Sequence, residues 1–166
     1  MDHKERPGEI PAPLDPASLP GDATLVFIGR ALTPWKTRDE CPKNLREARE
    51  RGQSASIEID EAWRQGIADL RPGDAIVVLT WFDRARRDLV VQAPRHRPNP
   101  AGVFSIRSPV RPNPIGLHVV RLLSVNLAGG RLEVDALDCL DRTPVLDLKP
   151  WRAGVDVPPD PAAPGR

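Results

Sequence analysis

Three prolines stiffen the segment 105–117, which reads Ser-Ile-Arg-Ser-Pro-Val-Arg-Pro-Asn-Pro-Ile-Gly-Leu. Each proline sets its own φ angle and drives the residue before it into extended geometry. Side chains two positions apart in an extended chain point the same way, so Arg111 and Asn113 are predicted to project together. A rigid loop that presents a guanidinium and a carboxamide suits the binding of a polar ligand. The alternative is a rigid crossover whose arginine pairs with a carboxylate elsewhere.

Charge is unevenly distributed, although the net charge is only +1. The segment 84–121 holds eight arginines, no lysine and one acidic residue, Asp88, and five acidic residues follow between positions 133 and 147. Arginine without lysine favours planar, bidentate recognition of phosphate or carboxylate groups. A nucleotide or nucleic-acid surface is one interpretation. The other is that basic and acidic faces pair with each other or simply face solvent.

The 166 residues are enough for one domain with a real core. Prolines concentrate at both ends, where apolar residues are scarce, so the sequence predicts disordered tails over 1–23 and 153–166 and a folded domain over 24–152. Neither a signal peptide nor a membrane span is expected. Two cysteines form neither a disulfide framework nor a metal-ligand pattern, and this favours a cytoplasmic setting.

Short β-branched and alternating runs dominate the folded part. Strands are expected over 24–32, 54–60, 75–82, 89–92, 103–107, 118–126, 131–137 and 145–148. Short helices are expected over 45–51 and 61–70, and Gly129-Gly130 predicts a hairpin turn. This pattern predicts a mainly β domain, either a barrel or a sandwich.

Several common chemistries have no support in the sequence. There is no glycine-rich dinucleotide fingerprint and no phosphate-binding loop. The three histidines, His3, His96 and His118, lie outside any hydrolase nucleophile motif. Paired Cys or His ligands at metal-binding spacing are missing as well, so no metal site is expected.

The run 102–117 resembles the signature of the TsaA-like, or TrmO-type, tRNA methyltransferases. Further motifs follow in the family's order: Phe-Ile-Gly-Arg at 27–30, Pro-Lys-Asn at 42–44, a central strand ending at 79–83, and Asp-Arg-Thr-Pro-Val-Leu-Asp-Leu-Lys-Pro at 141–150. Two positions depart from the family's pattern. Asp83 replaces the usual histidine and Arg142 the usual glycine.

The resemblance implies a small single-domain β-barrel, a homodimer and use of S-adenosyl-L-methionine. It implies methylation of N6 of N6-threonylcarbamoyladenosine in the anticodon loop of a threonine tRNA. By the same resemblance, the cofactor contacts come from several loops. They are Pro42, Lys43, Asn44, Phe82, Asp83, Arg107, Leu117, Asp141, Arg142, Thr143 and Pro144.

Chemical considerations suggest roles for some of these residues. Lys43 and Arg107 are candidates for the cofactor's carboxylate, since carboxylates bind best to basic side chains. Phe82 and Leu117 fit either an adenine slot or an ordinary core. Asp141 fits either the ribose hydroxyls or a capped turn.

Other residues are candidates for contacts to the substrate. Asp83 and Asp138 are both candidates for the group that accepts a proton, and the spacing favours neither. Arg111 and Asn113 are expected to order the cofactor or the modified base. Trp35 either stacks on an unpaired base or packs in its turn. The arginines expected to contact tRNA phosphates are Arg84, Arg86, Arg87, Arg95 and Arg97.

Two other functions remain open at this point. One is a catalytically silent module that binds nucleotide or RNA through its arginine-rich face. The other is a methyltransferase of the same fold that acts on a small metabolite, which the departures at Asp83 and Arg142 permit.

Overall fold

The computed structural model describes residues 6–14, 18, 21, 23–94 and 97–158. Its chain divides into two compact units. Unit 1 comprises Met1–Val26 and Trp81–Gly116, and unit 2 comprises Phe27–Thr80 and Leu117–Arg166.

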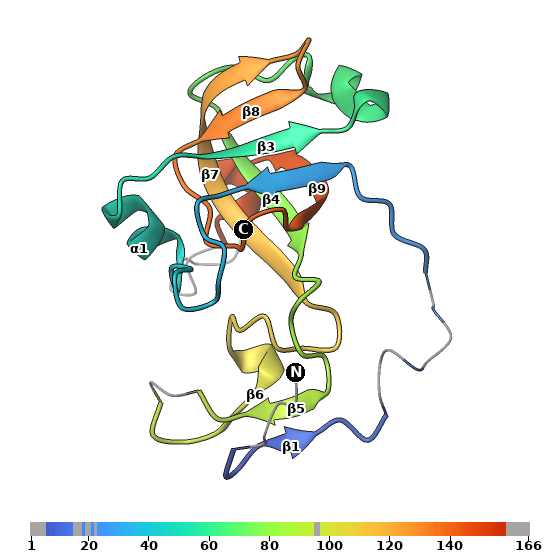
Figure 1. Ribbon diagram of the computed structural model, residues 1–166, viewed down its shortest axis with the longest axis vertical. Helices are drawn as coiled ribbons and strands as arrows, with labels where there is room; N and C mark the ends of the chain where they lie inside the picture. Colours follow the sequence, from blue (N-terminus) through green and yellow to red (C-terminus); the bar gives the residue numbers. More distant parts are fainter. Residues whose placement is uncertain (1–5, 15–17, 19–20, 22, 95–96, 159–166) are drawn as a thin grey trace, which may run out of the picture. The chain divides into compact units, whose positions relative to one another are not determined.

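A closed six-stranded barrel forms the centre of unit 2, with the strand order β2-β3-β8-β7-β4-β9 (Figure 1). The strands are β2 (Gly29–Leu32), β3 (Ala55–Ile59), β4 (Ala75–Trp81), β7 (Ile115–Asn126), β8 (Arg131–Val134) and β9 (Pro144–Pro150). By the division above, β4 ends and β7 begins in unit 1. Closure leaves the sheet without unpaired edges. The prediction of a mainly β barrel is confirmed.

The barrel interior follows from the period-two alternation of strands. In β4, Ile76, Val78 and Thr80 are buried, and their neighbours are partly exposed. In β7, His118 and Val120 are buried in the same way. The adjacent strands β4 and β7 therefore bury mainly apolar side chains together with Thr80 and His118.

Gly29 allows β2 and β3 to approach closely. It lies opposite Ile59 in the antiparallel register. A Cβ atom at position 29 would lie 2.0 Å from the backbone oxygen of Glu58, which no real side chain tolerates. Glycine is therefore required where the barrel closes on its first strand.

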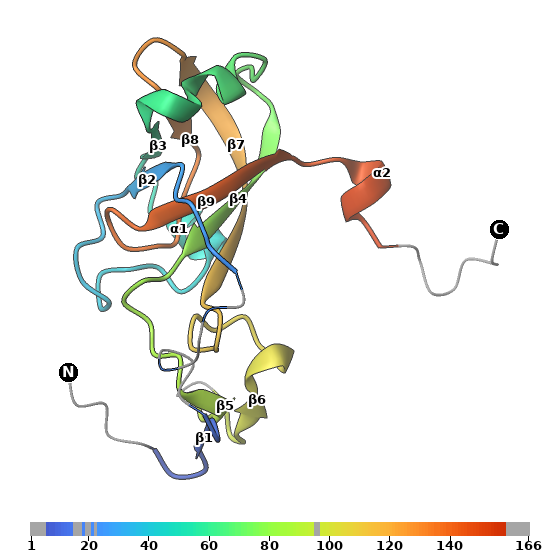
Figure 2. The same ribbon diagram turned by 90° about the vertical axis from the view of Figure 1, so that its right-hand side faces the viewer.

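Short helices connect the strands. They are α1 (Leu45–Glu50), the 3₁₀ helix η1 (Glu61–Ile67) and α2 (Ala153–Asp156), which follows β9 and extends away from the barrel strands in Figure 2. The Gly129-Gly130 hairpin is confirmed, and Gly130 adopts a φ of 64° there. No helix among the described residues has the length and apolar composition needed to cross a membrane.

Unit 1 contains a three-stranded sheet in the order β1-β5-β6. Its strands are β1 (Ile10–Pro11), β5 (Leu89–Gln92) and β6 (Ala101–Gly102), followed by the 3₁₀ helix η2 (Val103–Ser105). A small core of Leu89, Val103 and Val110 lies in this unit.

The N-terminal residues differ in part from the predicted tail. β1 pairs with β5. The side chain of Glu9 is only 2% exposed and lies 3.6 Å from Arg86. The composition of this segment did not predict its attachment, because the attachment depends on backbone pairing, an ion pair and hydrogen bonds of Arg6 and Glu9 to the backbone of Ala93. The C-terminal residues 159–166 lie outside the described part of the chain.

Two predicted strands also differ. Residues 103–105 form η2 rather than a strand, because the carbonyl oxygens of Val103 and Ile106 accept hydrogen bonds from the Arg111 guanidinium instead of from a neighbouring strand. The first strand begins at Gly29 and not at residue 24, and the exposure of Leu25 and Val26 shows that no sheet covers that stretch.

Candidate functional site

Two loops of unit 2 are tied to each other by hydrogen bonds. We call residues 33–44 the opening loop and residues 137–144 the closing loop. Thr33 Oγ1 donates to the carbonyl of Cys139 at 2.9 Å, and Trp35 Nε1 donates to the carbonyl of Leu137 at 2.9 Å. The backbone N–H of Asp141 donates to the carbonyl of Trp35 at 2.7 Å. The two loops therefore form one structural element, although about a hundred residues separate them in the chain.

The Asp141 carboxylate of the closing loop binds two residues of the opening loop. It accepts hydrogen bonds from the backbone N–H of Thr33 at 3.1 Å and from Lys36 Nζ at 2.6 Å. Burial raises the pKa of the carboxyl, but the bonds from Lys36 and Thr33 outweigh burial, and the pKa lies below its ordinary value of 3.8. Asp141 is therefore a carboxylate at neutral pH, fixed in orientation by both loops.

A pocket of about 380 Å³ adjoins Asp141. Its lining is largely polar: Thr33 and Lys36 of the opening loop, Ser54 and Ser56 near β3, and Arg131 and Glu133 of β8, with Leu32 and Ala55 as apolar members. Both signs of charge border the cavity. Its volume lies within the range of small-molecule sites.

The segment 42–44 turns the opening loop into α1. Asn44 is the N-cap of this helix, and its side chain accepts from the backbone N–H of Glu47 at 2.9 Å. The Glu47 carboxylate accepts in return from the backbone N–H of Lys43 at 3.0 Å. Pro42 is buried, while the side chain of Lys43 is exposed. Capping positions these residues, as expected for an asparagine before a short helix.

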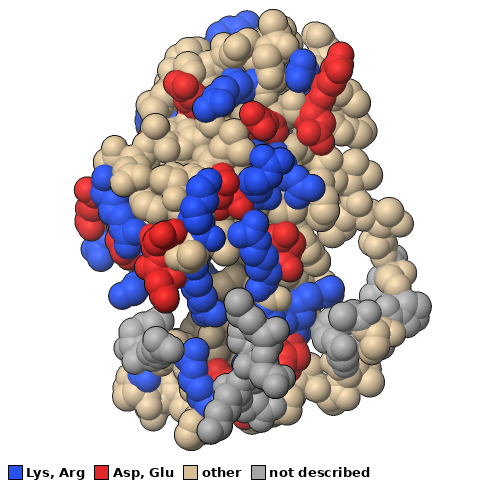
Figure 3. Space-filling model, viewed as in Figure 1, with Lys and Arg blue, Asp and Glu red and all other residues tan. Residues whose placement is uncertain are grey.

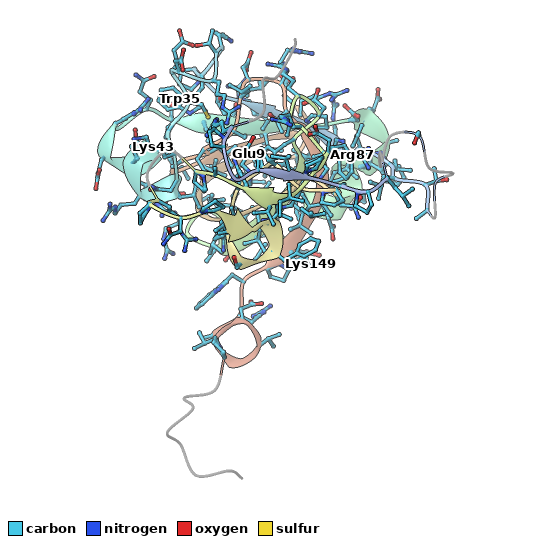
Figure 4. The ribbon with its side chains drawn as sticks, turned by 90° about the horizontal axis from the view of Figure 1, so that it is seen from below. Glu9, Trp35, Lys43, Arg87 and Lys149 are labelled. Atoms are coloured by element: carbon cyan, nitrogen blue, oxygen red, sulfur yellow. The ribbon has the colours of Figure 1, made fainter. Side chains whose placement is uncertain are left out.

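Trp35 is packed in its turn. Its ring is 5% exposed, and the Arg51 guanidinium lies 5.2 Å from the ring centre. Figure 4 labels Trp35 and Lys43, which both come from the opening loop. The packed turn, and not an open stacking platform, is therefore the role of this tryptophan in the structure.

Arg142 is the only non-glycine residue with a positive φ among the residues that the structure describes, at 64°. Its backbone N–H donates to the carbonyl of Ala31, and the N–H of Ala31 donates to the carbonyl of Thr143. These bonds hold the turn to β2 whatever residue occupies position 142. The left-handed conformation explains why glycine suits this position, and Arg142 occupies it under strain.

In unit 1, the proline-stiffened loop uses Arg111 to hold itself together. The Arg111 guanidinium donates to the carbonyls of Ser108 at 2.9 Å and Val103 at 3.1 Å, and also to that of Ile106. The rigidity predicted from the prolines therefore has a second source. Arg111 is bound inside its own loop, and Asn113 is exposed.

The five predicted phosphate-binding arginines differ in availability. Arg86 forms a two-point ion pair with Asp88 at 2.8 and 2.9 Å, and its side chain is 12% exposed. Arg87 donates to the carbonyl of Pro112 at 2.6 Å and lies over the Trp81 ring. Both arginines therefore make contacts within unit 1, and their assignment to tRNA phosphates stays a prediction.

Arg84 and Arg97 are exposed, and Arg95 lies outside the described residues. Figure 3 shows one face of the molecule, on which basic side chains interleave with acidic ones.

The remaining predicted cofactor residues lie outside the opening and closing loops. Phe82 is partly buried in unit 1, and its backbone N–H donates to the carbonyl of Pro114 at 2.8 Å. Asp83 and Arg107, also in unit 1, are exposed. Leu117 is 45% exposed on β7 of unit 2. Their assignment to a cofactor stays a prediction.

Sequence reasoning missed the environment of His118. The ring is 2% exposed, with Nε2 lying 3.0 Å from Thr80 Oγ1 and Nδ1 lying 2.6 Å from Asp138 Oδ1. The alternation of β7 carried a signal, since His118 shares its parity with Val120 and Leu122, which are core residues. Asp138 was a candidate, but its partners came from distant segments.

Comparison with known proteins agrees with this architecture. A family model described as the tRNA-methyltransferase O N-terminal domain matches residues 30–157. A probable S-adenosyl-L-methionine-binding protein VirR of Rhizobium radiobacter is 40% identical over 133 residues, covering 80% of this chain and 73% of that protein. An S-adenosyl-L-methionine-binding protein of Archaeoglobus fulgidus is 38% identical over 129 residues, covering 78% and 89% respectively.

A crystal structure of TrmO from Pseudomonas aeruginosa has the same fold. It superposes with a TM-score of 0.65 at 26% identity, covering 84% of this chain and 60% of that chain. This chain thus spans about three fifths of the length of that structure. The fold is therefore the β-barrel of TrmO-type methyltransferases. The chain belongs to the tRNA-methyltransferase O family.

Proposed function

We propose that this protein is an S-adenosyl-L-methionine-dependent methyltransferase that acts on N6 of N6-threonylcarbamoyladenosine in the anticodon loop of a threonine tRNA. The observation that carries the proposal is the pair of tied loops, because they hold most of the proposed cofactor residues. The relatives described as S-adenosyl-L-methionine-binding proteins support the cofactor. The family model supports tRNA as the substrate.

The residues around the pocket fit the proposed cofactor. Lys36 and Arg131 suit its carboxylate, while Glu133 suits its ammonium group. Asp141 is a carboxylate fixed by Thr33 and Lys36, and a carboxylate suits a ribose hydroxyl as a hydrogen-bond acceptor. Leu32 and Ala55 add the only apolar surface of the lining. The donor set therefore suits a small zwitterion that also carries a sugar.

When bound, the cofactor supplies a methyl group on a sulfonium that is already activated. Positioning can therefore account for most of the acceleration, since effective molarities of about 10⁵ M or more are available to well-oriented reactants. The hydrogen bonds between the opening and closing loops provide that orientation before any ligand arrives. Preorganised polar groups need little rearrangement during the reaction.

Calorimetry tests the cofactor site. We expect the wild-type protein to bind S-adenosyl-L-methionine and Asp141→Asn to bind it about tenfold or more weakly, because a charged hydrogen bond contributes about 1.5–3 kcal/mol. Asp39→Asn is the matched control, since Asp39 is an exposed carboxylate of the opening loop and does not line this pocket. Absence of heat with the wild-type protein at millimolar cofactor would leave the silent binding module as the function.

Mass spectrometry tests the substrate. Threonine tRNA from cells that lack the protein is incubated with the protein and cofactor, and the nucleosides are then analysed. The proposal expects conversion of N6-threonylcarbamoyladenosine to its N6-methyl derivative. Cofactor binding without any change in the tRNA would instead indicate a methyltransferase for a small metabolite.

We propose Arg84 and Arg97 as contacts to tRNA phosphates, because both are exposed whereas Arg86 and Arg87 are not. Each phosphate contact contributes about 0.7–0.9 to the slope of log affinity against log salt. The double variant of Arg84→Ala and Arg97→Ala should flatten that slope. Arg152→Ala, an exposed arginine beside α2, is the control that should leave it unchanged.

We further propose a cytoplasmic homodimer, as the resemblance implies. Leu123 on β7 is 50% exposed, and Leu117 on the same strand is 45% exposed. These two exposed leucines flank the exposed Arg121 on one face of β7, and we propose that a second copy covers this face. Light scattering should report a dimer for the wild-type chain and a monomer for Leu123→Glu. A monomeric wild-type chain would contradict this part of the proposal.

A further inference from the structure

Hydrogen bonds connect two adjacent barrel strands of unit 2 to the closing loop. The line of hydrogen bonds begins at Thr80 on β4, which has no exposed surface, and continues to His118 on the neighbouring strand β7. From His118 it reaches Asp138 on the closing loop, with a separation of 2.6 Å between Nδ1 and Oδ1. Thr80 also lies where the pairing of β4 with β9 shifts register.

The chemistry of the partners determines where the protons lie when the ring is neutral. A carboxylate only accepts hydrogen bonds, so His118 Nδ1 must carry the proton and donate to Asp138. Nε2 then has a free lone pair and accepts from the Thr80 hydroxyl. Thr80 thereby selects one tautomer of His118, and His118 holds one oxygen of Asp138.

The other oxygen of Asp138 is available to a ligand. Oδ2 makes no hydrogen bond within the part of the chain that the structure describes. The side chain is 20% exposed, in contrast to the 2% of His118. Asp138 is also held from both sides, because the carbonyls of Leu137 and Cys139 accept hydrogen bonds from the opening loop.

Asp138 lies next to the opening loop as well as to His118. Burial raises the pKa of the Cys41 thiol to about 12, and the charge of Asp138 adds to this effect. Cys41 directly precedes the proposed cofactor residues 42–44. The titratable groups that face Asp138 are thus His118, Cys41 and Cys139, and both thiols have a raised pKa and stay neutral at physiological pH. In this group of four residues, Asp138 supplies the only carboxylate.

We propose that Asp138 accepts the proton that the substrate nitrogen loses during methyl transfer, and that His118 and Thr80 are positioning residues that orient its carboxylate. This role rests on the proposed function. The nitrogen lone pair forms the new N–C bond, the C–S bond breaks with its electron pair going to sulfur, and the N–H proton passes to Oδ2. Because the N6 lone pair is delocalised into the purine, an acceptor at the proton assists the attack.

Asp83 was the alternative candidate for this role. It is exposed, and its backbone N–H donates to the carbonyl of Trp81. No described side chain is shown to orient its carboxylate. A proton acceptor has to be held within about hydrogen-bonding distance of the reacting atom, and orientation by a second group is the usual device. The hydrogen-bond geometry therefore favours Asp138.

The first test is Asp138→Asn, which keeps the size of the side chain and removes its basicity. We expect cofactor affinity by calorimetry to stay within about threefold, and the single-turnover rate of methyl transfer to tRNA to fall by about 10²–10⁴. Asp60→Asn is the control, because Asp60 is exposed and its side chain makes no capping bond. A rate for Asp138→Asn within a few-fold of wild type would overturn the proposal. An inactive wild-type protein would instead refute the proposed function, and the inference with it.

The second test addresses the positioning residues. Thr80→Val removes the hydroxyl at nearly constant volume, and Thr80→Ser restores it. We expect a reduced rate for the first, recovery for the second, and unchanged cofactor affinity for both. Nitrogen-15 NMR should show the Nδ1-protonated tautomer of His118 in the wild-type and Thr80→Ser proteins. The opposite tautomer, or equal rates for Thr80→Val and Thr80→Ser, would show that the network is only structural.

Discussion

Replacing Arg142 by glycine should make the protein more stable. A left-handed φ costs an L-residue about 1–2 kcal/mol, and glycine does not incur this cost. Glycine loses about 0.4–1 kcal/mol more chain entropy on folding. The difference leaves a net gain of about 0.5–1 kcal/mol for Arg142→Gly, because the φ of 64° persists in the wild-type turn. For a chain of this size the gain corresponds to a rise of about 1–4 °C in Tm.

Differential scanning calorimetry and urea unfolding measure this effect, and two variants separate its causes. Arg142→Ala removes the exposed side chain but keeps the Cβ atom, so its stability should stay near wild type. Arg38→Gly introduces glycine into the opening loop at an exposed position where φ is not positive, so it should lose stability. If Arg142→Gly is destabilised to the same degree as Arg38→Gly, the strain argument is wrong.

Three further outcomes follow from the geometry of the barrel and its loops. Gly29→Ala should prevent folding of the barrel, measured by circular dichroism, because its Cβ would overlap the backbone of Glu58. Lys36→Met should unfold at a higher pH in acid than wild type. The lowered pKa of Asp141 gives stability that is complete above its ordinary value of 3.8 and is lost as the pH falls through the folded value, and Lys36 is a main cause of that lowering. Finally, Cys41 should react with iodoacetamide at least about 100-fold more slowly in the folded protein than in urea. A thiol pKa of about 12 leaves very little of the reactive thiolate in the folded state. Peptide mapping measures both rates, and equal rates would refute this prediction.

Local pattern located most strands of the barrel, although the first one begins at Gly29 and not at residue 24. The apolar, β-branched run 75–82 predicted a strand and Gly129-Gly130 predicted a turn, and both predictions are confirmed because each depends on residues close in sequence. The helix at Leu45–Glu50 was also predictable, since its cap lies one residue before it. The expected strand over 103–107 failed for the opposite reason. Arg111, several residues further on, takes the carbonyls that a strand would have used.

The candidate site also has features that local motifs predicted and features that depend on contacts between distant residues. Sequence motifs pointed to segments 42–44 and 141–144, and they marked Arg111 and Asn113 as members of a rigid loop. They did not show that Trp35 and Thr33 bind the closing loop, nor that Arg86 is paired with Asp88 and Glu9. Which arginines remain available to a partner depends on such pairings, and these are made between distant parts of the chain.

The amino-acid sequence by itself determined the β character of the chain, the stiff proline loop and the family to which the chain belongs. It did so because backbone restriction, side-chain alternation and contiguous motifs act over a few residues. Only the tertiary structure decided that Thr80, His118 and Asp138 form one hydrogen-bonded line. Those residues come from two strands and a loop, and barrel closure is what brings them within hydrogen-bonding distance.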